Sequence, residues 1–301
     1  MKARVRGALV ILLALAAAVL ARAQQVSFKA RVDLVRVDVL VTDQGRPVSG
    51  LTRSDFEVRD NGRVQEIDAV FGAPQPLEVV LVLDVSASLH GQPFDHVKQA
   101  AWAAVEGLQA GDHIRLLTFS HRITMGAAEA AGAAAMRTTI ERLEASGNTS
   151  MFDALYSALA MAVGGPRRTV VLLFSDGRDN RSWLSAAAVV QAARESDTVV
   201  YAVAYKPPWR SASDYAGPGI ASGPDKDLLT KLANDTGGRL IWEDDSSRLP
   251  EVFQRLLAEV RSRYLLTCYP QDVSRTGWHA LSVRLKDKAG KVVARPGYIV
   301  R

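Results

Sequence analysis

The chain has 301 residues, of which 48% are hydrophobic and 23% are charged, a composition typical of globular proteins and not of disordered or fibrous ones. This length allows one large domain or two modest domains with hydrophobic cores. The formal net charge of +5 raises the question of a nucleic-acid partner. Cys268 is the only cysteine, which excludes an intramolecular disulfide.

The first 23 residues have the pattern of a signal peptide. Basic residues precede an apolar stretch over residues 8–20, which is too short to span a bilayer, and the segment ends in Ala21-Arg22-Ala23. Cleavage after Ala23 lowers the 37 Lys and Arg residues to 33, against 32 Asp and Glu residues. We therefore expect a secreted or periplasmic protein with no stable membrane span after cleavage, and no nucleic-acid partner.

Residues 24–76 are predicted to form strands. Apolar and polar residues alternate in VDLVRVDVLV, which is typical of a strand with one buried face. Turns are predicted at TDQGRPVSG and at Asn61-Gly62, and they separate the further strand candidates DFEV and VQEIDAVF. The segment GAPQP at 72–76 is typical of a linker.

From Leu77 the pattern changes to alternating strands and helices. The predicted strands have no polar face, as in a parallel sheet that is covered on both sides. They are 77–83, 113–119, 168–174, 198–205 and 239–243. The predicted helices are 94–108, 150–163, 183–195, 227–238 and 247–264, and the stretch 126–136 is expected to be a spacer that leads into a helix. This order predicts a doubly wound α/β domain over residues 77–262.

Residues 263–301 are again predicted to form strands, at 264–270, 279–287 and 291–300. Neither flank is long enough for a sheet sandwich of its own, whereas together they supply about six strands. We therefore expect one small all-β sandwich-like domain, split into residues 24–76 and 263–301, with the α/β domain inserted between its halves. Two separate β appendages on the α/β domain are the alternative.

Oxygen-bearing side chains follow or precede several of these elements. Asp84, Ser86 and Ser88 end the first apolar strand in LVLDVSASLH, Thr149 precedes a helix, and Asp176 follows the strand RTVVLLF. Ligands of open α/β sheets bind beyond the carboxyl ends of the strands, so we expect these five side chains to meet at one edge. With no Cys or His at ligand spacing, the oxygen set favours Mg²⁺, Mn²⁺ or Ca²⁺ over zinc.

Three kinds of enzyme site fit the sequence less well. Neither Ser86 nor Ser88 lies in a G-x-S-x-G motif, and no histidine is evidently placed as their base. An aspartyl-phosphate site usually has a second acid two residues after the nucleophile, where this chain has Ser86. No P-loop motif is present. Helix capping would explain one of these polar residues but not all five.

Asp84-x-Ser86-x-Ser88, Thr149 before a DAL helix start, and SDG with Asp176 resemble the metal-ion-dependent adhesion site (MIDAS) of the von Willebrand factor type A (VWA) domain. The resemblance covers roughly residues 77–262. The flanking stretches VTDQGRPVSGLTRSDFEV, YLLTCYP and ARPGY resemble those of exported bacterial VWFA-related proteins. The resemblance implies a VWA or Rossmann-like sheet and a divalent cation, first of all Mg²⁺, held by three hydroxyls and by two carboxylates that bind directly or through water.

The resemblance also implies a non-enzymatic protein-binding function, in which the bound cation accepts an Asp or Glu carboxylate from a protein partner. Loops at the same edge would select that partner. They contain residue types that are frequent at binding hot spots, namely Arg178, Arg181, Trp183, Trp209 and Tyr215. Two alternatives stay open: a hydrolase or phosphoryl-transfer enzyme that uses the same ion, and a scaffold component in which the ion is structural and the β-domain meets the partner.

Overall fold

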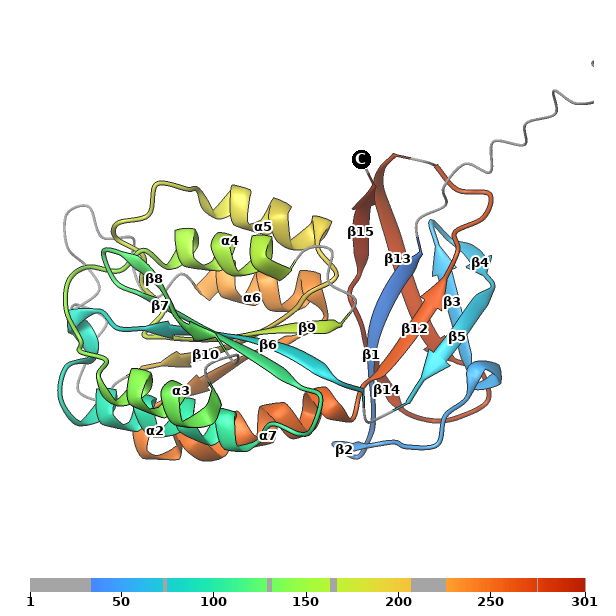
Figure 1. The fold of residues 1–301 in the computed structure, drawn as a ribbon. Helices are drawn as coiled ribbons and strands as arrows, with labels where there is room; N and C mark the ends of the chain where they lie inside the picture. The colour runs from blue at the N-terminus through green and yellow to red at the C-terminus, as the bar shows by residue number, and fades with distance from the viewer. Residues whose placement is uncertain are drawn as a thin grey trace, which may run out of the picture. The chain divides into compact units, whose positions relative to one another are not determined.

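One mostly parallel sheet with helices on both faces and two smaller antiparallel sheets make up the fold (Figure 1). The computed structural model describes residues 34–72, 75–128, 132–162, 167–206, 226–274 and 276–300. The predicted signal peptide at 1–23 lies outside these residues. None of the helices in the described ranges is both long and apolar enough to cross a membrane.

The large sheet has six strands, and all neighbouring pairs are parallel except the pair of β7 with β8 at one edge. In spatial order they are β11 (Arg239–Glu243), β10 (Val199–Tyr205), β9 (Arg168–Ser175), β6 (Leu77–Asp84), β7 (His113–Phe119) and β8 (Ile123–Ala128). This confirms the predicted doubly wound, mostly parallel sheet. The sequence did not predict β8, because an exposed edge strand lacks the continuous apolar run of the central strands.

Helices cover both faces of this sheet because its central strands are apolar on both sides. In β6, Leu81 and Leu83 pack in one hydrophobic cluster and Val80 and Val82 in another. The first face carries α2 (Gln92–Glu106), α3 (Gly132–Glu141) and α7 (Leu249–Arg261). The second face carries α4 (Met151–Ala162), α5 (Ala186–Glu195) and α6 (Lys226–Thr236). Short 3-10 turns are η1 (Arg53–Asp55), η2 (Ala87–Leu89) and η5 (Ser246–Arg248).

The two antiparallel sheets each combine strands from both ends of the described chain. One contains β14 (Lys291–Val293), β1 (Val35–Asp43), β12 (Tyr264–Cys268) and β5 (Ile67–Phe71), with β2 (Arg46–Pro47) beside β1. The other contains β15 (Gly297–Val300), β13 (Gly277–Leu285), β3 (Phe56–Asp60) and β4 (Arg63–Gln65). Apolar side chains of the two sheets share one buried cluster. Strand pairing therefore joins the two flanks, while the domain boundaries at 76/77 and 262/263 stay a prediction.

Several predicted elements differ from the observed ones where the chain changes partner. The predicted strand VQEIDAVF is divided into β4 and β5, which belong to different sheets. The predicted strand 291–300 is divided in the same way into β14 and β15, at Pro296, which has no backbone N–H for a ladder. The predicted spacer 126–136 instead contributes its first residues to β8. The predicted helix 183–195 begins only at Ala186, because the Ser185 hydroxyl caps it by accepting the Ala188 N–H.

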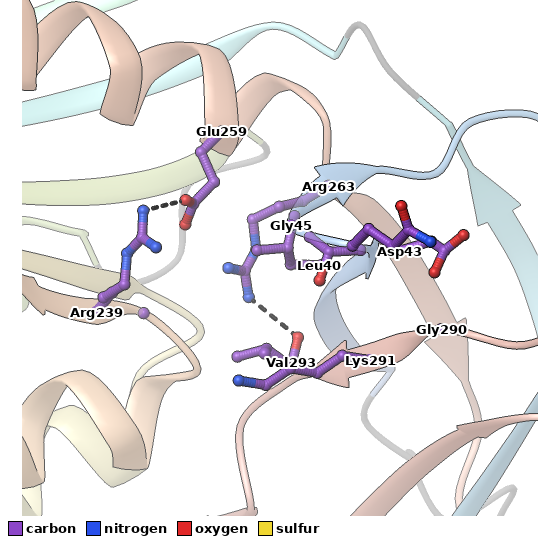
Figure 2. Close-up of a pocket in the computed structure, with 12 residues that line it drawn as sticks. Leu40, Asp43, Gly45, Arg239, Glu259, Arg263, Gly290, Lys291 and Val293 are labelled. Carbon is purple, nitrogen blue, oxygen red and sulfur yellow. Dashed lines mark hydrogen bonds and ion pairs between the residues drawn. The ribbon is translucent and has the colours of Figure 1, made fainter.

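Buried arginines link the antiparallel sheets to the α/β sheet. Arg263 is 1% exposed and donates to the Gly237 carbonyl at 2.7 Å and to the Tyr201 hydroxyl at 2.9 Å. Figure 2 shows its guanidinium directed at the Val293 carbonyl of β14. The carboxylate of Asp38 in β1 pairs with both Arg263 and Arg168. These contacts satisfy charges that would otherwise be costly to bury.

Arg295 makes a second link. Its guanidinium donates to the carbonyls of Ser196 at 2.7 Å and Arg194 at 3.0 Å, at the C-terminus of α5, where a cation is favoured by the helix dipole. Gly237 allows the close approach of this segment: its φ is +75°, and a Cβ there would lie 2.6 Å from the Arg295 nitrogen. The predicted helix 227–238 thus ends at Thr236, just before this glycine, which also makes room for the neighbouring sheet.

Candidate functional site

Three loops meet at the carboxyl end of the large sheet, beside its central strand β6. The N–H of Val85, just after β6, donates to the Phe119 carbonyl at the end of β7, and the Val85 carbonyl accepts from Ser146. The Ala87 N–H donates to the Gly147 carbonyl at 3.0 Å. The chain runs from β6 toward β7 on one side and later returns to β9 on the other, so this is the point where the strand order reverses. Ligand sites of open α/β sheets form at such points.

Asp84 is held rigidly at the centre of this site. Its side chain is fully buried; one carboxylate oxygen accepts the Ser86 N–H at 2.8 Å and the other accepts the Ser175 hydroxyl at 2.6 Å. The hydroxyls of Ser86 and Ser88 are hydrogen bonded at 2.9 Å, with Ser86 buried and Ser88 exposed. The alternating polar residues after β6 therefore lie together at the strand end, as their spacing predicted.

Two buried carboxylates create an environment that suits a cation. Burial, and after it the charge of Asp176, raise the pKa of the Asp84 carboxyl to about 7. Asp176 is itself buried, as is Thr149. No group of three or more His, Cys, Asp or Glu side chains in the described ranges could hold a metal. The donor set is of another kind, two carboxylates with neutral hydroxyls, and it fits a hard divalent ion.

The loop from Gly177 to Ser185 is tied to Thr149 and to the start of α4. The Thr149 carbonyl accepts the N–H groups of Asn180 and Arg181 at 3.0 and 3.1 Å, and the Thr149 N–H donates to the Asn180 side chain. The Asp179 carboxylate accepts the Phe152 N–H at 2.9 Å. Hydrogen bonds in both directions thus fix this loop, called here the 177–185 loop, against one of the predicted ligands.

A family model for the von Willebrand factor type A domain matches residues 78–255, which is more than half of the chain. The chain belongs to the von Willebrand factor type A domain family. VWA domains generally serve in protein–protein interaction, and the mixed sheet with its two layers of helices is the fold of this family.

The chain is also similar to individual proteins. An uncharacterized protein of Synechocystis sp. is 28% identical over 189 residues, which are 60% of this chain and 41% of the relative, so the chain spans less than half of that protein. The structure of a von Willebrand factor type A protein from Catenulispora acidiphila matches 84% of this chain and 74% of its own, at 15% identity and a TM-score of 0.53. Proximal thread matrix protein 1 of the mussel byssus matches 67% of this chain and 50% of its own, at 16% identity and a TM-score of 0.52.

The VWA domain places some of the predicted partner-binding residues on its surface. Arg181 and Trp183 are exposed on the 177–185 loop, and Arg178 is half-buried at its start. Trp209 and Tyr215 lie outside the described residues. The roles of these residues, and of the five predicted metal ligands, stay predictions.

Residues that the sequence analysis did not select also build the site of the VWA domain. Ser175 orients Asp84, and Asp153 of α4 accepts the N–H groups of Trp183 at 3.0 Å and Leu184 at 2.9 Å. Their partners lie about 30 to 90 residues away in the chain, so no local pattern reveals them. The only available signal was Ser175 in the SDG stretch, where it precedes a predicted ligand.

A histidine for which the sequence gave no role lies at the edge of the site. The ring of His121 packs so closely on Gly147 that a Cβ at this glycine would be 2.1 Å from Nδ1. The same Nδ1 lies 3.3 Å from the Ser120 hydroxyl. His121 is exposed, and it is a titratable group next to the loop that carries Thr149.

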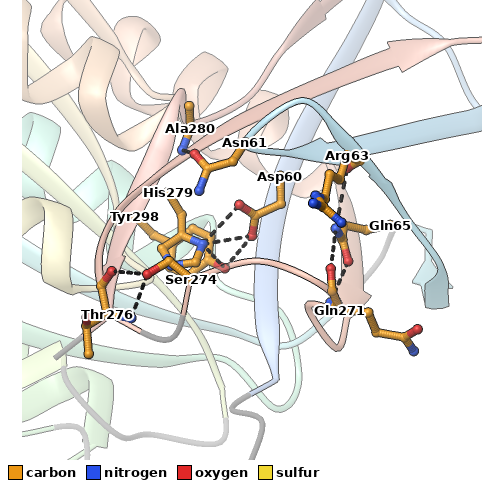
Figure 3. A network of polar contacts seen from close by, with 10 residues as sticks. All are labelled: Asp60, Asn61, Arg63, Gln65, Gln271, Ser274, Thr276, His279, Ala280 and Tyr298. Atoms are coloured by element: carbon orange, nitrogen blue, oxygen red, sulfur yellow. Dashed lines mark hydrogen bonds and ion pairs between the residues drawn. The ribbon is translucent and has the colours of Figure 1, made fainter.

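A separate polar cluster lies in the antiparallel sheets of the molecule. Figure 3 shows the Asp60 carboxylate facing both His279 and Tyr298: it is 2.9 Å from Nδ1 of the histidine and accepts the tyrosine hydroxyl at 2.6 Å. All three side chains are buried. Burial, and then the hydrogen bond to Asp60, raise the pKa of Tyr298. This network satisfies the Asp60 carboxylate, the Tyr298 hydroxyl and Nδ1 of His279 within the core, whereas the buried Nε2 of His279 has no hydrogen-bond partner among the described residues.

One cleft lies away from the predicted metal site. It has a volume of about 650 Å³ and is lined in part by Gly238 and Arg239, at the start of β11, and by Lys291 of β14 (Figure 2). The predicted metal site lies at the carboxyl ends of the parallel strands, whereas this cleft lies at the amino end of β11. Arg239 in the cleft is paired with Glu259.

Proposed function

We propose that this protein is an exported, non-enzymatic binding module. It would engage a carboxylate of a partner protein through a bound divalent cation, with Mg²⁺ as the preferred ion. Ser86, Ser88 and Thr149 would supply hydroxyl oxygens and Asp84 and Asp176 carboxylate oxygens. When bound, the cation would supply an electrophilic centre that accepts an Asp or Glu side chain. Its charge would be balanced by the two carboxylates.

The observation that carries this proposal is the buried pair of carboxylates at the switch point of the sheet. Asp84 has a raised pKa because its charge is desolvated and lies near that of Asp176, and a divalent cation would relieve both effects. The hydrogen bonds from the Ser86 N–H and the Ser175 hydroxyl hold Asp84 in one orientation. A rigid set of ligands lowers the entropic cost of binding.

Export is part of the proposal and is supported by the N-terminal sequence. The basic start, the apolar stretch and the small residues at Ala21 and Ala23 fit a cleaved signal. Expression of the full chain, followed by fractionation and mass determination of the product, tests this. A product that starts after Ala23 in the periplasm or medium is expected, and an uncleaved cytoplasmic product would contradict it.

Metal dependence is tested by calorimetric titration of Mg²⁺, Mn²⁺ and Ca²⁺ into the purified protein, followed by partner capture from envelope and culture extracts in Mg²⁺ or EDTA. Asp84→Ala is expected to lose both ion binding and capture. Asp287→Ala is the matched control, because it removes an exposed carboxylate in the connection between β13 and β14. Equal capture by the wild type in Mg²⁺ and EDTA, and by Asp84→Ala, would contradict the proposal.

His121 favours a metal-dependent hydrolase as a second candidate, since the ring lies next to the loop of Thr149. A hydrolase needs a positioned base in addition to the ion. Turnover of phosphoester or ester substrates that both Asp84→Ala and His121→Ala abolish would establish this second function. No turnover above background, together with metal-dependent capture, would leave the binding function.

A further inference from the structure

We propose that Trp183 and Arg181 form a specificity surface beside the predicted metal site, and that this surface selects an acidic peptide segment with a large apolar side chain near its metal-binding carboxylate. The inference rests on the proposed function, because the metal site supplies the anchor for the carboxylate. It goes further by stating the chemistry of the residues that flank this carboxylate in the partner.

Trp183 is unusually exposed for its residue type. Its side chain is 94% exposed, whereas most tryptophans bury a large part of the indole. Burial alternates along the loop, with Arg181, Trp183 and Ser185 exposed and the residues between them half-buried. Arg181 and Trp183 are therefore both exposed to solvent, two residues apart on the 177–185 loop.

The exposed indole is carried by backbone that the fold holds in place. The N–H of Trp183 donates to one oxygen of Asp153 at 3.0 Å, and the other oxygen accepts the Leu184 N–H. In return, the Ser182 hydroxyl accepts the Asp153 N–H at 3.1 Å. Because the loop is already ordered, binding a partner there loses little backbone entropy. An aromatic side chain on ordered backbone is typical of a binding hot spot.

The charges around Trp183 favour an acidic partner. Arg181 and Arg122 are exposed on two different loops, and both loops are hydrogen bonded to the Thr149–Ser150 segment. The Arg181 N–H donates to the Thr149 carbonyl, and on the loop of Arg122 the Ser120 carbonyl accepts the Ser150 N–H. The acid of the 177–185 loop, Asp179, is used within the site, since its oxygens accept the N–H groups of Phe152 and Ser182. Exposed positive charge therefore lies on two loops that bond to the segment of the predicted ligand Thr149.

These features together specify a partner segment. One Asp or Glu would reach the cation, a second acidic residue would pair with an exposed arginine, and an aromatic or long aliphatic side chain would pack on the Trp183 indole. Apolar burial supplies affinity there, while the charges favour acidic over basic segments.

The test uses a displayed library of random peptides with a fixed central Asp. Peptides are selected on the Mg²⁺-loaded full-length mature protein and eluted with EDTA. We expect the wild type to enrich an apolar residue at a fixed offset from the Asp, together with further acidic residues. Trp183→Ala is expected to lose the apolar preference and to weaken the best peptide at least tenfold, and Arg181→Glu is expected to lose the acidic preference.

Calorimetry and thermal unfolding separate this role from a structural one. Trp183→Ala must bind Mg²⁺ like the wild type and unfold at the same temperature. Trp278→Ala, which removes a partly exposed tryptophan of the antiparallel sheets, is the matched control and should bind the peptide like the wild type. EDTA-eluted peptides with no apolar preference, or a preference that survives Trp183→Ala, would overturn this inference alone. Absence of EDTA-eluted peptides would instead overturn the proposed function on which it rests.

Discussion

Replacing Asp38 by asparagine tests whether buried ion pairs hold the antiparallel sheets to the α/β sheet. Asp38 lies in β1, and its carboxylate pairs with Arg168 at the start of β9 and with Arg263 after α7. All three side chains are buried. Asparagine has nearly the same size, so the substitution removes the negative charge and leaves two buried guanidinium groups facing a neutral amide.

The expected loss of stability is large. For the Arg263 pair alone, 3.7 Å between Nε and the carboxylate oxygen corresponds to about 4–5 kcal/mol at an effective dielectric constant of roughly 20. Breaking a buried pair by removing one partner typically costs about 3–5 kcal/mol, because the remaining charge stays desolvated. We therefore expect the free energy of unfolding to fall by about 3–5 kcal/mol in Asp38→Asn.

Urea unfolding, followed by tryptophan fluorescence and far-ultraviolet circular dichroism, measures this loss. The midpoint should fall by more than about 1 M. Glu141→Gln is the control, because its pair with Arg137 is more than half exposed and should contribute less than about 0.5 kcal/mol. A loss below about 1 kcal/mol in Asp38→Asn would refute the reasoning. So would two separate transitions in the wild type, since the sheets would then unfold independently.

Three further predictions concern single positions. In EDTA, Asp84→Asn should unfold at the same or a higher temperature at pH 8 and lose any stabilisation by Mg²⁺. The pKa of Asp84 is about 7 in the folded protein and about 3.9 in the unfolded chain. In EDTA, its contribution to the free energy of unfolding should therefore fall as the pH rises from about 4 to 7. An increase in the stability of the wild type relative to Asp84→Asn over that pH range would contradict this. Burial, and then the charge of a nearby carboxylate, raise the pKa of the Cys268 thiol to about 11. A disulfide reagent at pH 8 should therefore label Cys268 only when the protein unfolds. Rapid labelling of the native protein would show instead that the thiol is accessible. Gly237→Ala should lower the free energy of unfolding in urea by at least about 1 kcal/mol more than Gly45→Ala. Both glycines have a positive φ, but only a Cβ at position 237 would lie 2.6 Å from the backbone nitrogen of Arg295. Equal losses would indicate that the backbone moves to accept the Cβ.

The sequence by itself determined the elements whose signal is local. The uninterrupted apolar run of β6 predicted a strand that is buried on both faces, and the alternation Asp84-x-Ser86-x-Ser88 predicted oxygens gathered at its end. The change to strand and helix alternation at Leu77 predicted the doubly wound sheet. Each of these inferences depends on spacing within a few residues, which sequence periodicity records directly.

Only the tertiary structure decided which distant segments became partners. It assigned β4 and β5 to different sheets, placed the Ser175 hydroxyl on Asp84, and joined Asp38 to Arg263, 225 residues further along the chain. It also bound the 177–185 loop to α4, so that the predicted helix 183–195 begins only at Ala186 and Trp183 faces solvent. Hydrogen bonds and ion pairs of this kind depend on donor and acceptor atoms that the folded backbone brings within about 3 Å, and no periodicity within one segment encodes that proximity.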